Sequence, residues 1–195
     1  MNREKELLDI LTKNSDLMMI LDEISELKLS NWYVAAGSVF QSVWNYLDKN
    51  DLMTNVHDID LVYFDDQISF IDSVSNDKQL EKSLSEKFPY RFDVHNEAYM
   101  HLWQNSKKIP YENTENAIER WIATVHAIGI SGNSDQFTIF APYGLDDIFT
   151  KTIRPIYHKD NNQELYENKV AKWQERFSDL NIIKSVSYTH LRAHE

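Results

Sequence analysis

Apolar residues along this chain switch repeatedly between the spacing of a helix and that of a buried strand. Residues 1–29 are predicted to be helical because their apolar positions recur every three or four residues. Residues 31–36 predict a short buried strand. Gly37 allows a turn after that strand, and Ser38 can cap the next helix. The apolar stripe of this helix consists of Val39, Phe40, Val43, Trp44 and Leu47.

Residues 58–64 predict a second strand, and its acidic residues are the first sign of chemistry. Because side chains alternate between the faces of a strand, Asp58 and Asp60 project together, while the apolar residues between and after them point to the opposite face. Two carboxylates side by side repel each other unless a cation or a proton lies between them. The pattern therefore places an acidic pair where a rigid strand meets solvent, which is a suitable position for a metal site.

The second half of the chain continues with helices and strands in mixed order. Further strands are expected at residues 90–94, 128–130 and 137–141. Further helices are expected at residues 80–88, 96–103, 113–127, 145–150 and 162–177. No internal repeat or low-complexity linker interrupts this pattern. Residues 30–183 are therefore interpreted as one domain, preceded by the helical segment 1–29.

The last residues, 184–195, are interpreted as a tail that is non-native or disordered. From Ser187 onward the sequence has no helical or strand rhythm. It resembles a nonsense peptide that recurs at the ends of unrelated sequences. His190 and His194 are therefore excluded as metal ligands.

Charge and composition limit the partners that this chain can have. Its 195 residues carry a formal charge of −11, which opposes binding to long nucleic acid because that affinity comes largely from Lys and Arg on phosphates. Cysteine is absent, which excludes disulfides, thiolate metal sites and thiol nucleophiles. No apolar run approaches the ~20 residues of a membrane span, and the N-terminus lacks the apolar core of a signal peptide. A cytoplasmic location without a membrane partner is expected.

A third carboxylate, Asp93, is flanked by apolar residues of the strand expected at residues 90–94. Burying a carboxylate is costly unless it has a partner. Asp93 is therefore either salt-bridged or part of the cluster with Asp58 and Asp60, and the spacing leaves both interpretations open.

The turn at Gly37 and Ser38 is a candidate phosphate site, because the N-terminus of the helix that follows exposes free N–H groups. Such a turn on its own is more often structural than functional. Its position ahead of the acidic strand favours the functional interpretation.

These residues together resemble the nucleotidyltransferase fold of the DNA polymerase β superfamily. Longer segments make the resemblance more specific: VAAGSVFQSVW at 34–44, HDIDLVYFD at 57–65, DVHNEAYMHLW at 93–103, ERW at 119–121, APYGLDDIF at 141–149 and a final Arg-Pro. They are similar to the bacterial nucleotidyltransferase-like family catalogued as the domain of unknown function DUF925. The similarity covers about residues 30–183.

The resemblance implies an α+β fold, with a small mixed sheet flanked by helices, and a mechanism. Asp58 and Asp60 would hold one or two Mg²⁺ ions, with Mn²⁺ as the alternative metal, and Asp93 would be a third ligand or the base. Gly37 would let the backbone approach the phosphates, and Ser38 would donate to them. The implied reaction transfers a nucleoside monophosphate from an NTP to a hydroxyl group of a small molecule or a protein.

The basic groups are where this chain departs from the family. His95 and Tyr99 stand where a basic residue and an arginine are common, and a neutral histidine brings less charge to a phosphate at pH 7 than those residues do. His95, Arg120 and Arg154 are the candidates for binding the nucleotide, although either arginine could instead pair with an acid. His57 replaces a residue that is usually small and polar.

The alternative function is a non-catalytic module with the same fold, either a nucleotide-binding regulator or an antitoxin-like partner. A complete set of three acids argues against it, because an idle carboxylate cluster would only cost stability. A phosphohydrolase is disfavoured because the Gly-Ser turn precedes the acids, as it does in transferases. Geometry distinguishes these alternatives: an enzyme requires Asp58, Asp60 and Asp93 to converge on an open cleft.

Overall fold

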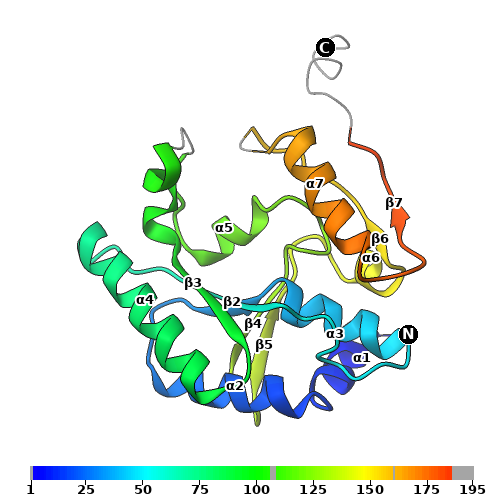
Figure 1. The fold of residues 1–195 in the computed structure, drawn as a ribbon, viewed down its shortest axis with the longest axis horizontal. Coiled ribbons are helices and arrows are strands. Elements are labelled where there is room, and N and C mark those ends of the chain that lie inside the picture. Colours follow the sequence, from blue (N-terminus) through cyan, green and yellow to red (C-terminus); the bar gives the residue numbers. More distant parts are fainter. Residues whose placement is uncertain (1, 106–108, 160, 186–195) are drawn as a thin grey trace.

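A five-stranded sheet in the order β3-β2-β1-β4-β5 forms the centre of the computed structural model, which describes residues 2–105, 109–159 and 161–185 (Figure 1). The strands are β1 (Tyr33–Ala35), β2 (Asp58–Tyr63), β3 (Arg91–Asn96), β4 (Gly129–Gly132) and β5 (Phe137–Phe140). Neighbours β2 and β3 run parallel, and the other neighbouring pairs run antiparallel. The expected mixed sheet is confirmed.

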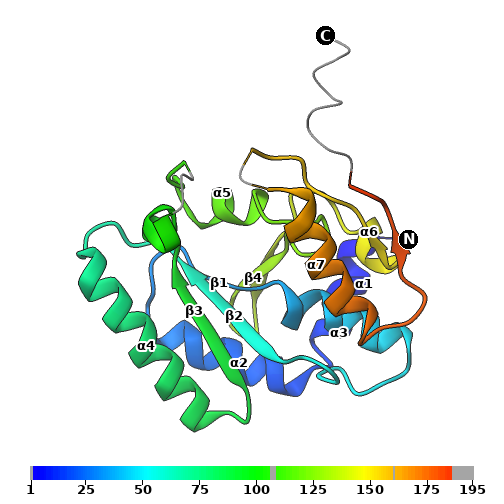
Figure 2. The same ribbon diagram turned by 45° about the horizontal axis from the view of Figure 1, so that its top comes forward.

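Helices lie on both sides of this sheet. The helices are α1 (Arg3–Leu11), α2 (Ser15–Glu26), α3 (Gly37–Leu47), α4 (Phe70–Lys87), the 3₁₀ helix η1 (Glu97–Asn105), α5 (Thr114–Glu119), α6 (Asp146–Phe149) and α7 (Gln163–Gln174). In both views α2 and α4 lie on one side of β2 and β3, and α5 and α7 lie on the other (Figures 1 and 2). A small parallel pair, β6 (Thr152–Ile153) and β7 (Asn181–Ile182), lies near α6 and α7.

The helical segment predicted for residues 1–29 is divided into α1 and α2. Asn14 causes the break, because its side chain accepts a hydrogen bond from the backbone N–H of Leu17 at 3.1 Å and so caps α2. The same side chain donates to the hydroxyl of Ser42 on α3 at 2.9 Å. The cap therefore also holds α2 against α3.

The turn from β1 into α3 differs from the sequence prediction. Helix α3 begins at Gly37, its N-cap is Ala36, and no side chain caps it, so the prediction that Ser38 is the cap is wrong. Ala36 has φ 53° and ψ −122°, a conformation that costs a residue with a Cβ some strain. Its side chain is fully buried. The sharp turn is therefore held by tertiary packing rather than by a capping side chain.

The helix predicted for residues 113–127 is correct only in its first half, because α5 ends at Glu119. The backbone of the following segment bonds to a distant part of the chain: the N–H of Thr124 donates to the carbonyl of Arg154 at 3.0 Å, and that of Ile156 donates to the carbonyl of Ile122 at 3.1 Å. Helical periodicity in the sequence is overridden here by tertiary hydrogen bonds, which bring residues 120–126 beside the acidic strands.

Strand β2 separates the core from the site. Ile59 and Leu61 are fully buried in the main apolar cluster, which also includes residues of α1, α2 and α3. On the opposite face, Asp58 and Asp60 are only partly buried, while Val62 packs into a second, smaller apolar cluster. The predicted alternation of the strand is confirmed, and the acids lie on the face that α5 and α7 cover.

Only residues 184 and 185 of the predicted tail are described. The rest of that prediction, including His190 and His194, lies outside the described residues. Among the described residues, no helix has both the length and the apolarity needed to cross a membrane.

Candidate active site

Two carboxylates on the central strands are direct neighbours. In the parallel register of β2 and β3, Asp60 stands opposite Asp93, and Asp58 stands opposite Arg91. Asp58 lies on the same face of β2 as Asp60, because two positions separate them. The structure therefore brings the three predicted acids to one region of the sheet.

Asp60 and Asp93 line a cavity of about 330 Å³. The other residues that line this cavity include His95, Glu97, Met100, Tyr111, Arg120, Trp121, His126, Leu165 and Lys169. Asp58 is outside this lining. The cavity thus has carboxylates on the strands and aromatic and basic side chains from α5, α7 and the segment after α5.

A second cavity of about 370 Å³ adjoins the first, since Ile122 and Asn161 line both. Tyr157, Asn162 and Glu164 are among its other lining residues. It lacks the pair of strand carboxylates. For this reason the chemistry is assigned to the cavity of Asp60 and Asp93.

The charge of Asp60 is poorly compensated. Burial, and then the negative charges of Asp58 and Asp93, raise the pKa of Asp60 to about 7. Lys169 and His95 oppose this increase but do not cancel it. A cation bound beside Asp60 would therefore stabilise the ionised form of this carboxyl group.

Asp93 has a partner, His95, as the salt-bridged interpretation expects, and it also stands opposite Asp60, whereas Asp58 does not join them in the cavity lining. The Nε2 atom of His95 lies 3.2 Å from a carboxylate oxygen of Asp93. This hydrogen bond lowers the pKa of Asp93. Burial alone would lower the pKa of His95, but the bond to Asp93 and the nearby charges of Asp93, Glu97 and Asp77 raise it to about 9. The surrounding carboxylates thus favour the protonated form of His95, which would bring more charge to a phosphate than a neutral histidine does.

The carboxylate oxygens at this site suit Mg²⁺, which can take some of its ligands from substrate and water. They suit less well a metal ion that takes all of its ligands from the protein. Among residues 2–105, 109–159 and 161–185, no three His, Asp or Glu side chains are grouped closely enough to hold a metal ion. Mg²⁺ commonly binds one or two carboxylates and takes its other oxygens from substrate phosphates and water. Asp60, with its uncompensated charge and with Asp58 on the same face, fits that requirement.

The two arginines predicted to bind the nucleotide are in different places. Arg120 lines the cavity, where its guanidinium donates to the Asn116 side chain at 2.6 Å and to the Ile109 carbonyl at 3.2 Å. Its guanidinium carbon also lies 5.1 Å from the centre of the Tyr111 ring. The aromatic ring and these acceptors fix its direction.

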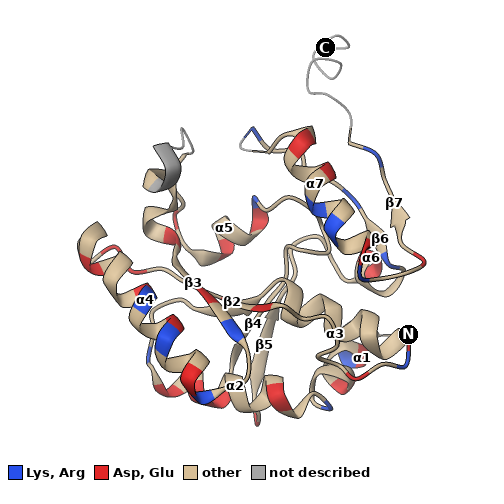
Figure 3. Ribbon diagram, in the orientation of Figure 1, with Lys and Arg blue, Asp and Glu red and all other residues tan. Residues whose placement is uncertain are grey.

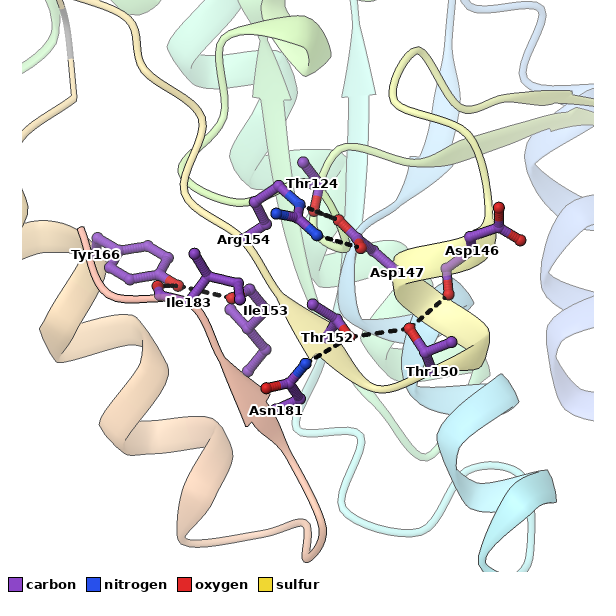
Figure 4. A network of polar contacts seen from close by, with 10 residues as sticks. All are labelled: Thr124, Asp146, Asp147, Thr150, Thr152, Ile153, Arg154, Tyr166, Asn181 and Ile183. Carbon is purple, nitrogen blue, oxygen red and sulfur yellow. Dashed lines mark hydrogen bonds and ion pairs between the residues drawn. The ribbon is translucent and has the colours of Figure 1, made fainter. Parts of the chain in front are cut away.

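Arg154 lies outside the cavity lining and is bound to an acid. Its Nε donates to Asp147 at 3.1 Å, and Thr124 donates to the same carboxylate at 2.7 Å (Figure 4). These bonds join Asp147 on α6 to Arg154, the residue directly after β6. The structure therefore gives Arg154 a structural contact.

The side chain of Ser38 also points away from the cavity. It is fully buried, and its hydroxyl donates to the carbonyl of Ala35 at 3.1 Å. Gly37 opens α3, and a Cβ added there would come within 2.9 Å of the Gln41 side chain. Any phosphate contact at this turn thus depends on the free backbone N–H groups at the start of α3.

Two other family departures, Tyr99 and His57, lie away from the cavity. Tyr99 donates its hydroxyl to the carbonyl of Ile68 and packs its ring 5.8 Å from that of Phe70. His57 is exposed beside the start of β2. Neither residue lines the cavity.

Several cavity residues were not identified from the sequence as functional candidates. Lys169 lies on α7, and no local pattern links it to the acids of β2 and β3. His126 stacks on Trp121 with ring centres 4.8 Å apart and contacts Trp173 at 5.7 Å. Burial and the charge of Lys169 hold the pKa of His126 well below its ordinary value. Trp121, the last residue of the ERW motif, also lies in the cavity wall.

Comparison with known proteins supports the class that this geometry indicates. The chain is similar to a protein whose solution structure is described as revealing a CCA-adding enzyme head domain, with 31% identity over 93% of this chain and 96% of that chain and a TM-score of 0.78. This similarity establishes the fold as that of the polymerase-β-like nucleotidyltransferases. A further structure, described as a tRNA-processing enzyme complex, has a TM-score of only 0.41 and 20% identity over 68% of this chain and 34% of that chain. No curated protein matches the sequence significantly.

Residues 22–182 also match the sequence profile of a family described as nucleotidyltransferase. The chain belongs to this nucleotidyltransferase family. The expected resemblance, the α+β fold and the assignment to this class of enzyme are confirmed.

Proposed function

We propose that this protein is a Mg²⁺-dependent enzyme that transfers a nucleoside monophosphate from an NTP to a hydroxyl group of a small molecule or a protein. The observation that carries the proposal is the pairing of Asp60 with Asp93 across parallel strands in one cavity. The poorly compensated negative charge of Asp60 favours the binding of a cation beside it. The formal charge of −11 makes a long nucleic acid a poor acceptor.

The cavity lining contains groups that suit both parts of a nucleotide. Carboxylates at one side would meet the phosphates through a bound cation. Trp121, which is only partly buried in the cavity lining, offers a flat apolar surface for a nucleobase. An NTP that spans the cavity would place its α-phosphorus near Asp60.

In the proposed reaction, the acceptor oxygen forms a bond to the α-phosphorus. The bond from that phosphorus to its bridging oxygen breaks, and the electron pair leaves with pyrophosphate. Asp58 and Asp60 would hold Mg²⁺, which would supply positive charge to the phosphates. Asp93, kept ionised by His95, would accept the proton of the acceptor hydroxyl or orient that hydroxyl.

One observation favours the alternative, a non-catalytic nucleotide-binding or regulatory module. The ion pair with His95 occupies the carboxylate of Asp93, which an enzyme would use as a third ligand or base. Such a module would bind a nucleotide without turning it over.

Binding and turnover of the four common NTPs test the proposal. Calorimetric titration with Mg²⁺ and with EDTA should show one or more NTPs that bind only with the metal, and slow release of pyrophosphate with water as the acceptor should accompany binding. Asp60→Asn should abolish both signals. Asp135→Asn, which removes an exposed carboxylate from the β4–β5 hairpin, is the matched control and should retain them. Binding without pyrophosphate release, even with a metabolite extract as the acceptor source, would favour the non-catalytic module.

A further inference from the structure

Helix α7 contributes one charged side chain to the cavity, Lys169. Lys169 is partly buried, and its ammonium nitrogen lies 5.8 Å from the centre of the Trp173 ring. Trp173 itself is fully buried in the core. The contact with a fixed ring restricts the direction of the lysine stem and presents its ammonium to the cavity.

Three other cations near the acids are already bound to protein groups, and a fourth, Arg91, is exposed and lies outside the cavity lining. His95 is paired with Asp93, and Arg120 donates to Asn116 and to a backbone carbonyl. Arg176, which lies near Asp58, donates to the carbonyls of Asn55 and Lys172 at 3.0 and 3.1 Å. Helix α7 carries two lysines, Lys169 and Lys172, and its basic positions are the blue segments of this helix in Figure 3.

Lys169 differs from these residues. Within the described part of the chain, it makes no hydrogen bond and no ion pair within 4.0 Å. Its charge nevertheless lowers the pKa of both Asp60 and Asp93, so the ammonium is near the two carboxylates without binding either. A partly buried ammonium without an acceptor has three N–H groups to offer to an anion.

We infer that Lys169 binds the part of the donor that leaves, namely the β- and γ-phosphates of the NTP. This inference rests on the proposed function. A triphosphate brings more negative charge into the cavity than a metal at Asp58 and Asp60 neutralises, and Lys169 supplies a compensating charge on the side opposite the strands. His126 stands beside it but remains neutral, so it does not duplicate that charge.

In the transfer step, Lys169 donates hydrogen bonds and exchanges no atom. The bond between the α-phosphorus and the bridging oxygen breaks, and its electron pair stays on that oxygen as pyrophosphate forms. The ammonium is bound to oxygens whose negative charge increases during this step, which strengthens the interaction as the reaction proceeds.

The test compares three variants at the same helix. Lys169→Met removes the charge but keeps an unbranched apolar stem for the Trp173 contact, and Lys169→Arg keeps the charge. Lys172→Met removes an exposed lysine of α7 that is outside the cavity lining and is the matched control. Inorganic tripolyphosphate, the best-bound NTP and its parent nucleoside are each titrated in the presence of Mg²⁺, and circular dichroism and Tm report folding.

Lys169→Met should weaken the binding of tripolyphosphate and of the NTP by the same factor, about 10- to 100-fold, as expected for the loss of a hydrogen bond to a charged group. Nucleoside affinity should change less than about twofold, because stacking contacts are kept. Lys169→Arg should recover most of the loss, and Lys172→Met should bind like the wild type.

Equal binding of tripolyphosphate by wild type and a folded Lys169→Met would overturn the inference and leave the proposed function intact. A parallel loss of nucleoside affinity would also overturn it, since that would indicate a general packing role. If Lys169→Met fails to fold, Lys169→Gln gives the same comparison. If the wild type binds no triphosphate at all, the proposed function itself is contradicted.

Discussion

Asp60 and Asp93 face each other across two parallel strands, yet their pKa values move in opposite directions. Asp93 has the ion pair with His95, whereas Asp60 has two like charges nearby and, among the described residues, no cation bound to it. The protein therefore compensates the negative charge of Asp93 with His95 but leaves that of Asp60 without a bound cation. The group that lacks compensation is the better candidate to meet a ligand cation.

Asp60→Asn should stabilise the metal-free protein while it abolishes metal-dependent nucleotide binding. The substitution removes a carboxylate whose ionised form is disfavoured by burial and by Asp58 and Asp93. We expect a gain of about 1–3 kcal/mol in the free energy of unfolding at pH 8, given 1.4 kcal/mol per pKa unit and partial solvent screening. Urea denaturation in EDTA measures it.

The pH dependence of that gain is also defined. Because the pKa of Asp60 is raised from 3.8 to about 7 in the folded protein, its stabilising contribution is fully present only below about pH 4 and is lost progressively as the pH rises to about 7. The difference in unfolding free energy between Asp60→Asn and wild type should therefore be smallest near pH 4, increase through pH 5 and 6, and level off by about pH 8. A constant difference across this range would show that Asp60 titrates normally. Asp135→Asn again serves as the control.

His126→Phe should make the protein less sensitive to acid. The folded protein keeps His126 neutral, so the unfolded chain binds more protons below the ordinary histidine pKa of about 6.5, and folding stability is lost as the pH falls. Between pH 6.5 and 5.5 the wild type should lose about 1 kcal/mol more than the variant, within the limit of 1.4 kcal/mol per pH unit. Phenylalanine retains the stacking on Trp121 and Trp173. Thermal melts in a pH series provide the measurement, and parallel curves would contradict the assignment.

The ion pair between Lys151 and Asp48 should be the most sensitive charge contact outside the cavity. Lys151 is buried with 7% exposure and binds Asp48, which follows α3. Asp48→Ala leaves a buried ammonium without its anion and should cost about 3 kcal/mol, because breaking a buried pair on one side is worse than losing both partners.

A double-mutant cycle with Lys151→Met is the appropriate comparison. The double variant should recover part of the loss caused by Asp48→Ala. Additive effects, measured by chemical denaturation, would mean that the two side chains do not interact in solution.

Ser38→Ala should affect stability more than nucleotide binding. The hydroxyl donates to the buried carbonyl of Ala35, and loss of this bond should cost about 1 kcal/mol. Triphosphate affinity should stay within about twofold of wild type, since only backbone N–H groups at this turn can reach a ligand. A large loss of affinity in a stable variant would show that the side chain rotates to bind phosphate.

The sequence by itself determined the local elements and the acidic strand. Period-two alternation placed Asp58 and Asp60 on one face of β2, and a sharp turn was correctly expected between β1 and α3, although it lies at Ala36 and not at Gly37. These features depend on neighbouring residues, and so a local pattern can predict them. The ordered motifs then identified the nucleotidyltransferase family, which the family match and the similarity to a solved structure confirm.

Tertiary structure decided where the remaining cavity residues lie. Helix α5 stops at Glu119 because the next residues bond to the segment at residues 154–156, and this brings Trp121 and His126 into the wall. Lys169 comes from a helix near the end of the chain. The partner of Asp93, in contrast, stands two positions along the same strand, where alternation puts His95 on the same face. Contacts between distant segments depend on how the whole chain packs, and no periodicity in one segment encodes them.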